Sequence, residues 1–364
     1  MTIRFAILGP GKVARLHADA LARIPDARLV AVAGRDPSRA AAVARATGAR
    51  VDPGLEATIE RGGVDAVIVC TPHPLHAQQA IAAARAGLHV VVEKPMALDP
   101  ADCDEMIAAA REAGVVLSVV SQRRWYAPVQ RVKAAIDEGR IGEPGLASVE
   151  ILGWRGPDYY AMDAWRGTQA GEGGGVLVNQ AVHQLDLVRW FLGPVAEVDA
   201  WTANVNHPEL DVEDTVVAAV RFTSGALASV VASNAQRPGL HARVHVHGRS
   251  GASVGVETDA GSSFVAGLSL PGPPRNDLWT IPGEEAAPGL WVEQDAAALA
   301  GTDPATYHHE LQLHDVVAAI RDDRPPAVDG ADGRAAVELI DAIYRAARSG
   351  ERVRLAPSPQ PGVT

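Results

Sequence analysis

Short apolar runs and helical segments alternate over the first 120 residues, and this alternation constrains the fold more than any other feature. Strands separated by helices of ordinary length form right-handed βαβ units. We therefore predict an α/β fold that begins with a parallel, doubly wound sheet. The predicted strands cover residues 3–8, 29–33, 65–70, 89–92 and 115–120, and the predicted helices cover residues 11–24, 37–47, 75–86 and 99–113.

The pattern changes near Arg123, where apolar runs typical of an antiparallel sheet begin. The turn Thr223-Ser224-Gly225 predicts a hairpin between two of these runs. Residues 257–306 are rich in glycine and proline, so we expect peripheral strands and loops there. The other predicted strands cover residues 147–152, 195–204, 215–222, 227–233, 242–247 and 352–355, and two helices are predicted near residues 306–321 and 333–348.

These patterns predict two domains and a tail. Residues 1–122 are expected to carry the parallel sheet, and residues 123–355 an α+β domain with an open, mainly antiparallel sheet. Residues 356–364, with three prolines, are expected to form a flexible tail. A chain of 364 residues is long enough for two domains, each with its own core.

Composition limits the partners of the chain. A net charge of −11 with no lysine- or arginine-rich run argues against nucleic acid or an anionic membrane as partner. No apolar stretch approaches the ~20 residues of a membrane span, and we expect no export leader, because the first residues have no basic segment followed by a long apolar one. Cys70 and Cys103 have no close-spaced partner, so we expect reduced thiols. A cytoplasmic protein is predicted.

A glycine-rich turn joins the first predicted strand to the first helix, in the pattern Gly-x-Gly-x-x-Ala. Gly9 permits the tight turn, Gly11 permits close approach of a pyrophosphate, and Ala14 permits close packing of helix on strand. The backbone N–H groups at the start of this helix, with Lys12 and Val13, can face phosphates. A glycine turn without a ligand is the alternative, but the βαβ context favours dinucleotide binding.

The end of the second strand bears on the choice between NAD and NADP. Gly34 stands where NAD enzymes place an acid that binds the ribose. Room at Gly34, together with Arg35 and Arg39, favours a 2′-phosphate and therefore NADP. The alternative is that Asp36 caps the next helix and both arginines are solvated, which leaves NAD open.

Two further strand ends carry unusual polar residues. Thr71 and Pro72 follow the third predicted strand, with His76 shortly after, and Glu93 and Lys94 follow the fourth. Ligands of such sheets bind outside the carboxyl ends of the strands, so we expect these residues to face the cofactor. Partial desolvation would make Lys94 a candidate proton donor or acceptor.

Taken together, four segments resemble the Gfo/Idh/MocA oxidoreductases: the glycine turn, Thr71-Pro72 with Leu75-His76, Glu93-Lys94-Pro95, and the stretch at residues 173–186. The resemblance implies a Rossmann domain followed by an α/β domain whose open sheet often mediates oligomerisation. It also implies hydride transfer between a nicotinamide cofactor and a sugar, cyclitol or related carbinol. We accordingly expect a sugar-like substrate and a homo-oligomer, a dimer or tetramer, formed through the C-terminal sheet.

The stretch at residues 173–186 leads from three glycines into a predicted helix over residues 176–192. Asn179, His183 and Asp186 are spaced i, i+4 and i+7, which puts them on one face of an α-helix. A core histidine satisfied by a carboxylate is the structural alternative. The resemblance implies instead that His183 is the general acid/base, assisted by Lys94. Asn179 replaces an aspartate of many relatives, so it can orient substrate but cannot exchange a proton.

Aromatic and arginine residues gather between Trp154 and Thr168. Aromatic rings such as that of Tyr159 suit the C–H faces of sugars, and Arg166 suits a carboxylate, phosphate or amide. A loop pinned by its own aromatics is an equal alternative. The resemblance places Trp165 and Arg166 near the nicotinamide and substrate, and Gln122 near the cofactor.

We expect no metal, since no histidine group has the spacing of a metal motif. The predicted function is an NAD(P)-dependent oxidoreductase, with NADP preferred, that acts on a carbinol or carbonyl carbon through Lys94 and His183. Asn179, Asp186, Arg166 and Tyr159 are the predicted substrate residues. The alternatives are a non-catalytic, dinucleotide-responsive binding protein and a redox-neutral, NAD-dependent glycoside hydrolase on the same fold.

Overall fold

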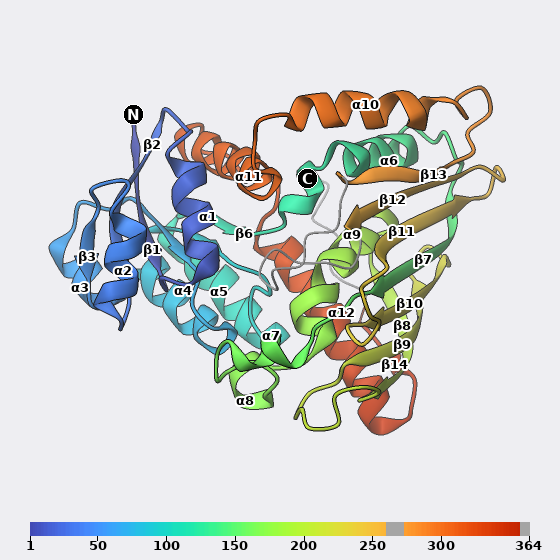
Figure 1. The fold of residues 1–364 in the computed structure, drawn as a ribbon, viewed down its shortest axis with the longest axis horizontal. Helices are drawn as coiled ribbons and strands as arrows, with labels where there is room; N and C mark the ends of the chain where they lie inside the picture. The colour runs from blue at the N-terminus through green and yellow to red at the C-terminus, as the bar shows by residue number, and fades with distance from the viewer. Residues whose placement is uncertain (260–272, 357–364) are drawn as a thin grey trace. The chain divides into compact units, whose positions relative to one another are not determined.

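The computed structural model describes residues 1–259 and 273–356, and the chain forms two compact units (Figure 1). The first unit joins Met1–Trp125 to Gly301–Val337, and the second joins Tyr126–Ala300 to the segment that begins at Glu338. Sequence patterning assigned residues 301–337 to the C-terminal domain, whereas their contacts group them with the first unit. The tail expected at residues 356–364 lies outside the described residues, apart from Ala356.

A six-stranded parallel sheet forms the centre of the first unit, in the order β3-β2-β1-β4-β5-β6. This confirms the predicted parallel, doubly wound sheet. Strand β3 and helix α3 were not predicted, because a strand of three residues carries too little periodicity. The strands are β1 (Ile3–Leu8), β2 (Ala27–Ala33), β3 (Arg50–Asp52), β4 (Ala66–Val69), β5 (His89–Val92) and β6 (Leu117–Val119). The helices between them are α1 (Lys12–Leu21), α2 (Pro37–Ala44), α3 (Leu55–Arg61), α4 (His76–Arg85) and α5 (Pro100–Ala113), with a short 3-10 turn at His73–Leu75.

Helices cover both faces of this sheet, which explains its continuous apolar strands. In β1, Phe5 and Ile7 pack into the core shared with α1, α2 and α11 (Pro304–Arg321), while Ala6 and Leu8 pack into the core shared with α4 and α5. The apolar face of α11 is why residues 301–337 return to the first unit. Two cores therefore hold the carboxyl ends of the strands in fixed positions.

Residues of the returning segment also close the edge of the sheet at β6. The Gln312 side chain donates to the Val119 carbonyl at 2.7 Å and accepts the Ser121 N–H at 3.0 Å. Ser118 Oγ donates to the Val328 carbonyl at 2.9 Å. An otherwise open edge is thereby paired. A 3-10 turn at Gln122–Trp125 follows β6 and contains Gln122, a predicted cofactor contact.

The second unit contains an eight-stranded open sheet in the order β13-β12-β11-β7-β10-β9-β8-β14. The predicted open, mainly antiparallel sheet is confirmed, with one parallel pair, β7 with β10. The hairpin at Thr223-Ser224-Gly225 joins β9 to β10, with Gly225 at φ 87°. The strands are β7 (Pro144–Leu152), β8 (Val195–Ala203), β9 (Thr215–Phe222), β10 (Leu227–Ser233), β11 (His241–Gly248), β12 (Ser253–Asp259), β13 (Arg275–Trp279) and β14 (Val353–Arg354).

Helix α10 (Ala287–Leu299) lies where strands and loops were expected from the glycine and proline content. Its anchor is a long-range ion pair, in which Arg131 donates to both oxygens of Asp295 at 2.6 and 2.7 Å. Local composition therefore could not reveal it. The other helices are α6 (Ala127–Asp137), α7 (Pro157–Ala161), α8 (Gln169–Glu172), a π turn (Leu177–Ala181) and α9 (Val182–Leu192), and α12 (Gly330–Ser349) contains the boundary between the units.

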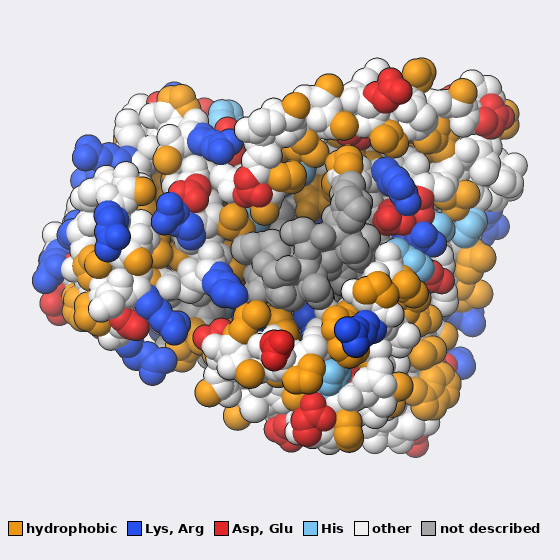
Figure 2. All heavy atoms as spheres, in the orientation of Figure 1, with side chains coloured by type: hydrophobic (Ala, Val, Ile, Leu, Met, Phe, Trp, Pro, Cys, Tyr) orange, Lys and Arg blue, Asp and Glu red, His pale blue; other side chains and the backbone are white. Residues whose placement is uncertain are grey.

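One face of the second sheet is in the core and the other is exposed. In β9, Val216, Ala218 and Val220 are buried, whereas Val217 is 46% exposed. Trp201 on β8 pairs with Val217 and is 68% exposed. Among the described residues, no helix is long and apolar enough to cross a bilayer. Figure 2 shows side chains of both charge signs interspersed over the face that it draws.

Candidate functional site

The glycine turn has the geometry predicted for it. Gly9 adopts φ +88°, and a Cβ there would lie 2.7 Å from the Cys70 carbonyl oxygen, so only glycine fits. Helix α1 begins after Gly11 without a side-chain cap, so its first N–H groups are directed at what binds in front of the helix. Ala14 is fully buried under the sheet. These residues suit a dinucleotide pyrophosphate.

At the end of β2, the structure shows the arrangement given above as the alternative, in which Asp36 caps the next helix and both arginines are exposed. Asp36 caps α2, with its Oδ1 accepting the N–H groups of Ser38 and Arg39 at 2.9 and 3.1 Å, and it also pairs with Arg39 at 3.5 Å. Packing explains the glycine at position 34, because a Cβ there would lie 2.3 Å from Pro10 Cδ. Arg35 and Arg39 are exposed. Their contact with a 2′-phosphate stays a prediction.

His76 ties together the loops that follow β4 and β5. One ring nitrogen faces the Pro95 carbonyl at 2.9 Å and the other faces the Thr71 carbonyl at 2.8 Å. Burial lowers the pKa of this imidazole, while the two carbonyls and Glu93 oppose that shift. Both ring nitrogens of His76 face backbone carbonyls, and the single N–H of the neutral imidazole can donate to one of them; its contact with the cofactor stays a prediction. The structure therefore describes it as a support for these loops.

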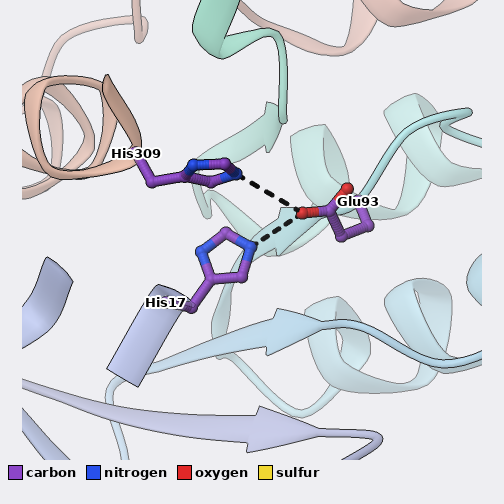
Figure 3. A group of neighbouring side chains, drawn as sticks. All are labelled: His17, Glu93 and His309. Atoms are coloured by element: carbon purple, nitrogen blue, oxygen red, sulfur yellow. Dashed lines mark hydrogen bonds and ion pairs between the residues drawn. The ribbon is translucent and has the colours of Figure 1, made fainter. Parts of the chain in front are cut away.

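The Glu93 carboxylate lies at the carboxyl end of β5, and one of its oxygens faces two imidazoles, those of His17 and His309 (Figure 3). His17 Nε2 lies 2.8 Å from Glu93 Oε1, and His309 Nε2 lies 4.0 Å from the same oxygen. All three residues are at least nine-tenths buried. Burial alone would raise the pKa of Glu93, but the bond from His17 and nearby positive charge lower it to about 2. Glu93 is therefore an anion at neutral pH. Sequence patterning missed both histidines, whose only signal is a polar residue on an apolar helix face.

Lys94 follows directly, and its backbone N–H donates to Glu93 Oε2 at 3.2 Å. The Lys94–Pro95 peptide bond is cis. The residue is half-buried at the end of β5, beside β4. Its position is therefore that of a ligand-facing residue in a doubly wound sheet.

His17, Glu93 and His309 are close enough to be considered as metal ligands. Two ligands of one tetrahedral zinc ion lie about 3.3 Å apart, given bonds of roughly 2.0 Å. The 2.8 Å between His17 and Glu93 is shorter than this and is the length of a hydrogen bond. A proton shared between the two residues accounts for the contact.

In the second unit, two adjacent glycines allow close approach of backbone and side chains. A Cβ on Gly174 would lie 2.2 Å from the Tyr344 hydroxyl, and one on Gly175 would lie 1.8 Å from the Glu213 carbonyl oxygen. The Glu213 carboxylate accepts the N–H groups of Gly175 and Leu177 at 3.0 and 3.1 Å, and the Tyr344 hydroxyl at 2.9 Å. Burial raises the pKa of Glu213. Sequence reasoning did not identify this carboxylate.

The helix predicted over residues 176–192 is interrupted. A π turn covers Leu177–Ala181, and the α-helix begins at Val182. Asn179 lies in the π turn, whereas His183 and Asp186 lie in the regular α-helix that follows; that the three side chains share one face stays a prediction. His183 and Asp186 are buried, at 8% and 6% exposed.

Three of the predicted substrate residues lie together. Arg166 Nη1 donates to the Tyr159 hydroxyl at 2.5 Å, and Asn179 Nδ2 donates to the same hydroxyl at 3.0 Å and to the Glu172 carboxylate. The Arg166 guanidinium lies over the rings of Tyr159 and Trp165, at 4.4 and 4.5 Å from their centroids. Lys94 belongs to the first unit, and His183 with Asp186 to the second. Their roles stay predictions.

A glycine turn before an uncapped helix, with a lysine and an anion at the carboxyl end of another strand of the same sheet, is typical of dinucleotide-binding α/β enzymes. Residues 3–121 match the family model for "Oxidoreductase family, NAD-binding Rossmann fold", and residues 129–254 match the "GFO/IDH/MocA C-terminal domain". The chain belongs to the Gfo/Idh/MocA oxidoreductase family, which confirms the resemblance. It is an oxidoreductase with a Rossmann domain for NAD or NADP.

Similar proteins extend over nearly the whole chain. Inositol 2-dehydrogenase from Rhizobium meliloti (strain 1021) is 29% identical, over 98% of this chain and 100% of its own. The 1,5-anhydro-D-fructose reductase from Ensifer adhaerens is 30% identical, over 97% and 98%. Among solved structures, the WlbA dehydrogenase from Bordetella pertussis, in complex with NADH and UDP-GlcNAcA, has a TM-score of 0.82 at 34% identity, over 98% and 100%.

Proposed function

We propose that the chain transfers a hydride between a nicotinamide cofactor and a carbinol or carbonyl carbon of a sugar, sugar derivative or cyclitol. The observation that carries the proposal is the position of Lys94 at the carboxyl end of β5, next to the ionised Glu93 and in the same unit as the glycine turn. Ligands of doubly wound sheets bind at this edge. Relatives that act on inositol and an anhydro-sugar support the substrate class.

The residues present fit the cofactor. The tight turn at Gly9 and the uncapped N-terminus of α1 would hold the pyrophosphate, and Thr71, Pro72 and Gln122 would line the remaining contacts. When bound, the nicotinamide accepts the hydride from the substrate carbon or returns it.

The chain's own part in the reaction is proton transfer at the substrate oxygen. In oxidation, the O–H bond breaks as the C–H hydride leaves and a C=O bond forms, so a base must take the hydroxyl proton. We assign this step to His183, with the Lys94 ammonium polarising the oxygen. Asn179 and Asp186 would bind neighbouring hydroxyls, with Tyr159 and Arg166 beside them.

The preference for NADP remains part of the proposal. Arg35 and Arg39 can bind a 2′-phosphate, and the Asp36 carboxylate is already engaged by the cap of α2. Titration of the enzyme with NADPH and NADH, followed by nicotinamide fluorescence, measures the preference. Tighter binding of NADH would contradict it.

We also propose self-association through the exposed face of the second sheet. Trp201 pairs with Val217, and Leu146 pairs with Leu227, and all four are between 46% and 68% exposed. A second copy of this face would cover these side chains. Light scattering should show a dimer or tetramer for the wild type and smaller particles for Val217→Lys, while Leu290→Lys on α10 serves as a control. A wild-type monomer would contradict the proposal. The cytoplasmic location stays a prediction.

Kinetics of two variants test the catalytic assignment. Lys94→Met and His183→Asn should each lower kcat by about 100-fold or more, with near-normal binding of NADPH. Near-normal turnover in both variants would reject it. Cofactor binding without turnover of any sugar or cyclitol, in the wild type, would favour a binding protein instead.

A further inference from the structure

The Glu93 carboxylate connects two parts of the first unit that the proposed function uses separately. One oxygen, Oε1, accepts from His17 in α1, the helix that begins at the glycine turn. The other oxygen, Oε2, accepts the backbone N–H of Lys94. A single anion therefore bridges the phosphate-facing helix and the lysine.

The donors and acceptors of the neighbouring groups show which atoms carry the protons around this anion. A carboxylate only accepts, so the hydrogen of the 2.8 Å contact belongs to His17 Nε2. His309 Nδ1 lies 2.7 Å from the Ala305 carbonyl and must donate to it. Burial lowers the pKa of His309 to about 4, so its Nε2 carries a lone pair at neutral pH. The bond to Glu93 therefore comes from His17.

His309 limits the position of the His17 ring. The two imidazoles meet edge to face, with centroids 5.0 Å apart and planes at 89° (Figure 3). His17 is 1% exposed and His309 is 5% exposed, so protein atoms surround both rings. Helix α11 thereby packs against α1 through these two rings, and this contact is a second reason for residues 301–337 to join the first unit.

Other titratable groups among the described residues also act on Glu93. Lys94 stabilises the anion, while Cys70 and His76 also interact with its charge. By reciprocity, the Glu93 anion favours the ammonium form of Lys94. Lys94 would be the first group affected by loss of the anion or by a change in its orientation.

We propose that His17, held by His309, is a positioning residue that keeps the Glu93 anion in place and thereby fixes Lys94 in register with the cofactor-binding helix. The inference rests on the proposed function, because it assigns Lys94 a role at the substrate oxygen. It extends that function to a buried histidine that touches neither cofactor nor substrate. Its distinguishing consequence is a change in Lys94 itself, which can be measured without turnover.

Three variants test the inference. His17→Leu removes the donor, His17→Gln retains an amide donor, and Glu93→Gln removes the charge. His308→Gln is the matched control, since His308 is also buried in α11 and its Nδ1 bonds to the Pro304 carbonyl, away from Glu93. The first measurement is the pH dependence of acetylation of Lys94 by acetic anhydride in the enzyme without cofactor, read by mass spectrometry. The second is the single-turnover rate of hydride transfer.

In Glu93→Gln, we expect Lys94 to become reactive at lower pH, because the anion that favours its ammonium form is gone. His17→Leu should lower the single-turnover rate by about 10- to 100-fold, with partial rescue in His17→Gln and NADPH affinity within about twofold of the wild type. His308→Gln should match the wild type in both measurements. If His17→Leu fails to fold, His17→Gln and Glu93→Gln still test the inference.

Wild-type labelling and rates in His17→Leu and Glu93→Gln, with Lys94→Met inactive, would overturn this inference and leave the proposed function intact. An active Lys94→Met would instead overturn the proposed function. Saturable binding of Zn²⁺ to the wild type, lost in His309→Gln, would show that the three residues act as metal ligands and would also overturn it.

Discussion

Gly175 and Glu213 are in contact along their backbones and through the Glu213 side chain. The Gly175 N–H donates to Glu213 Oε2 at 3.0 Å, and a Cβ on Gly175 would lie 1.8 Å from the Glu213 carbonyl oxygen. Glu213 also accepts the N–H of Leu177, the first residue of the π turn. The start of the helix that carries His183 is therefore held by a carboxylate from the segment before β9.

Gly175→Ala should disturb this contact. The backbone of residue 213 must move, so we expect the free energy of unfolding of the second unit to fall by about 2 kcal/mol and turnover to fall with it. Gly289→Ala in α10 is the control, because an added Cβ there meets no atom within 4 Å beyond its chain neighbours and the backbone of its own helix. It should leave stability unchanged or raise it by up to about 1 kcal/mol. Urea unfolding of both variants measures the difference, and equal stabilities would contradict this account.

Asn179→Asp would place a second acid beside Glu172. The Asn179 amide donates to the buried Glu172 carboxylate and to the Tyr159 hydroxyl. Two carboxylates in this place repel, so we expect Asn179→Asp to lower stability by about 2 kcal/mol at pH 7. The double variant with Glu172→Gln should recover most of that loss, because the donor and acceptor are then exchanged. A double-mutant cycle by thermal unfolding measures the coupling, and additive losses would count against it.

The sequence predicted the fold wherever a pattern was local. Alternating apolar runs indicated the parallel sheet, and the glycine turn indicated the dinucleotide site, because each depends on neighbours within one βαβ unit. Helix α10 and the return of residues 301–337 were missed, since they depend on Asp295 pairing with Arg131 and on the apolar face of α11.

The candidate site was predictable only in part, for the same reason. Lys94 and His183 stand in recognisable motifs. The residues that support them, His17 and Glu213, do not stand in such motifs, because dozens of positions in the chain separate them from the residues they hold. The π turn before α9 also has no periodic signal, because it adds a single widened turn to an apolar helix.

Stability of the first unit should fall in mild acid because of two buried histidines. Burial lowers the pKa values of His308 and His309 to about 4 from an ordinary 6.5. Between these values the unfolded chain binds more protons than the folded one, so stability is present above pH 6.5 and is lost as the pH falls to 4. Each group contributes about 3 kcal/mol at most across this window. Glu93, with its pKa lowered to about 2, contributes a loss only below pH 4.5.

Amide hydrogen exchange in α1 and β1 measures this loss of stability within the first unit. The exchange is recorded from pH 7 to pH 4.5 and corrected for intrinsic rates. His308→Gln and His309→Gln should each reduce the pH slope by up to about 1.4 kcal/mol per pH unit. An unchanged slope in both variants would show that these imidazoles do not titrate in this window.

Gly34→Asp places an acid where NAD enzymes bind the ribose, so it is the obvious substitution for a switch toward NAD, but the structure predicts that it fails alone. The new Cβ would lie 2.3 Å from Pro10 Cδ, so the glycine turn must shift and the affinity for both cofactors should fall by about tenfold. Pro10→Ala removes Cγ and Cδ of the ring and makes room. The double variant Pro10→Ala/Gly34→Asp should therefore regain NADH binding and prefer NADH over NADPH, because the new carboxylate accepts from the ribose hydroxyls and repels a 2′-phosphate. Fluorescence titrations of the four proteins with each cofactor measure the switch. Tight cofactor binding by Gly34→Asp alone would mean that the Pro10–Gly34 contact does not control this site.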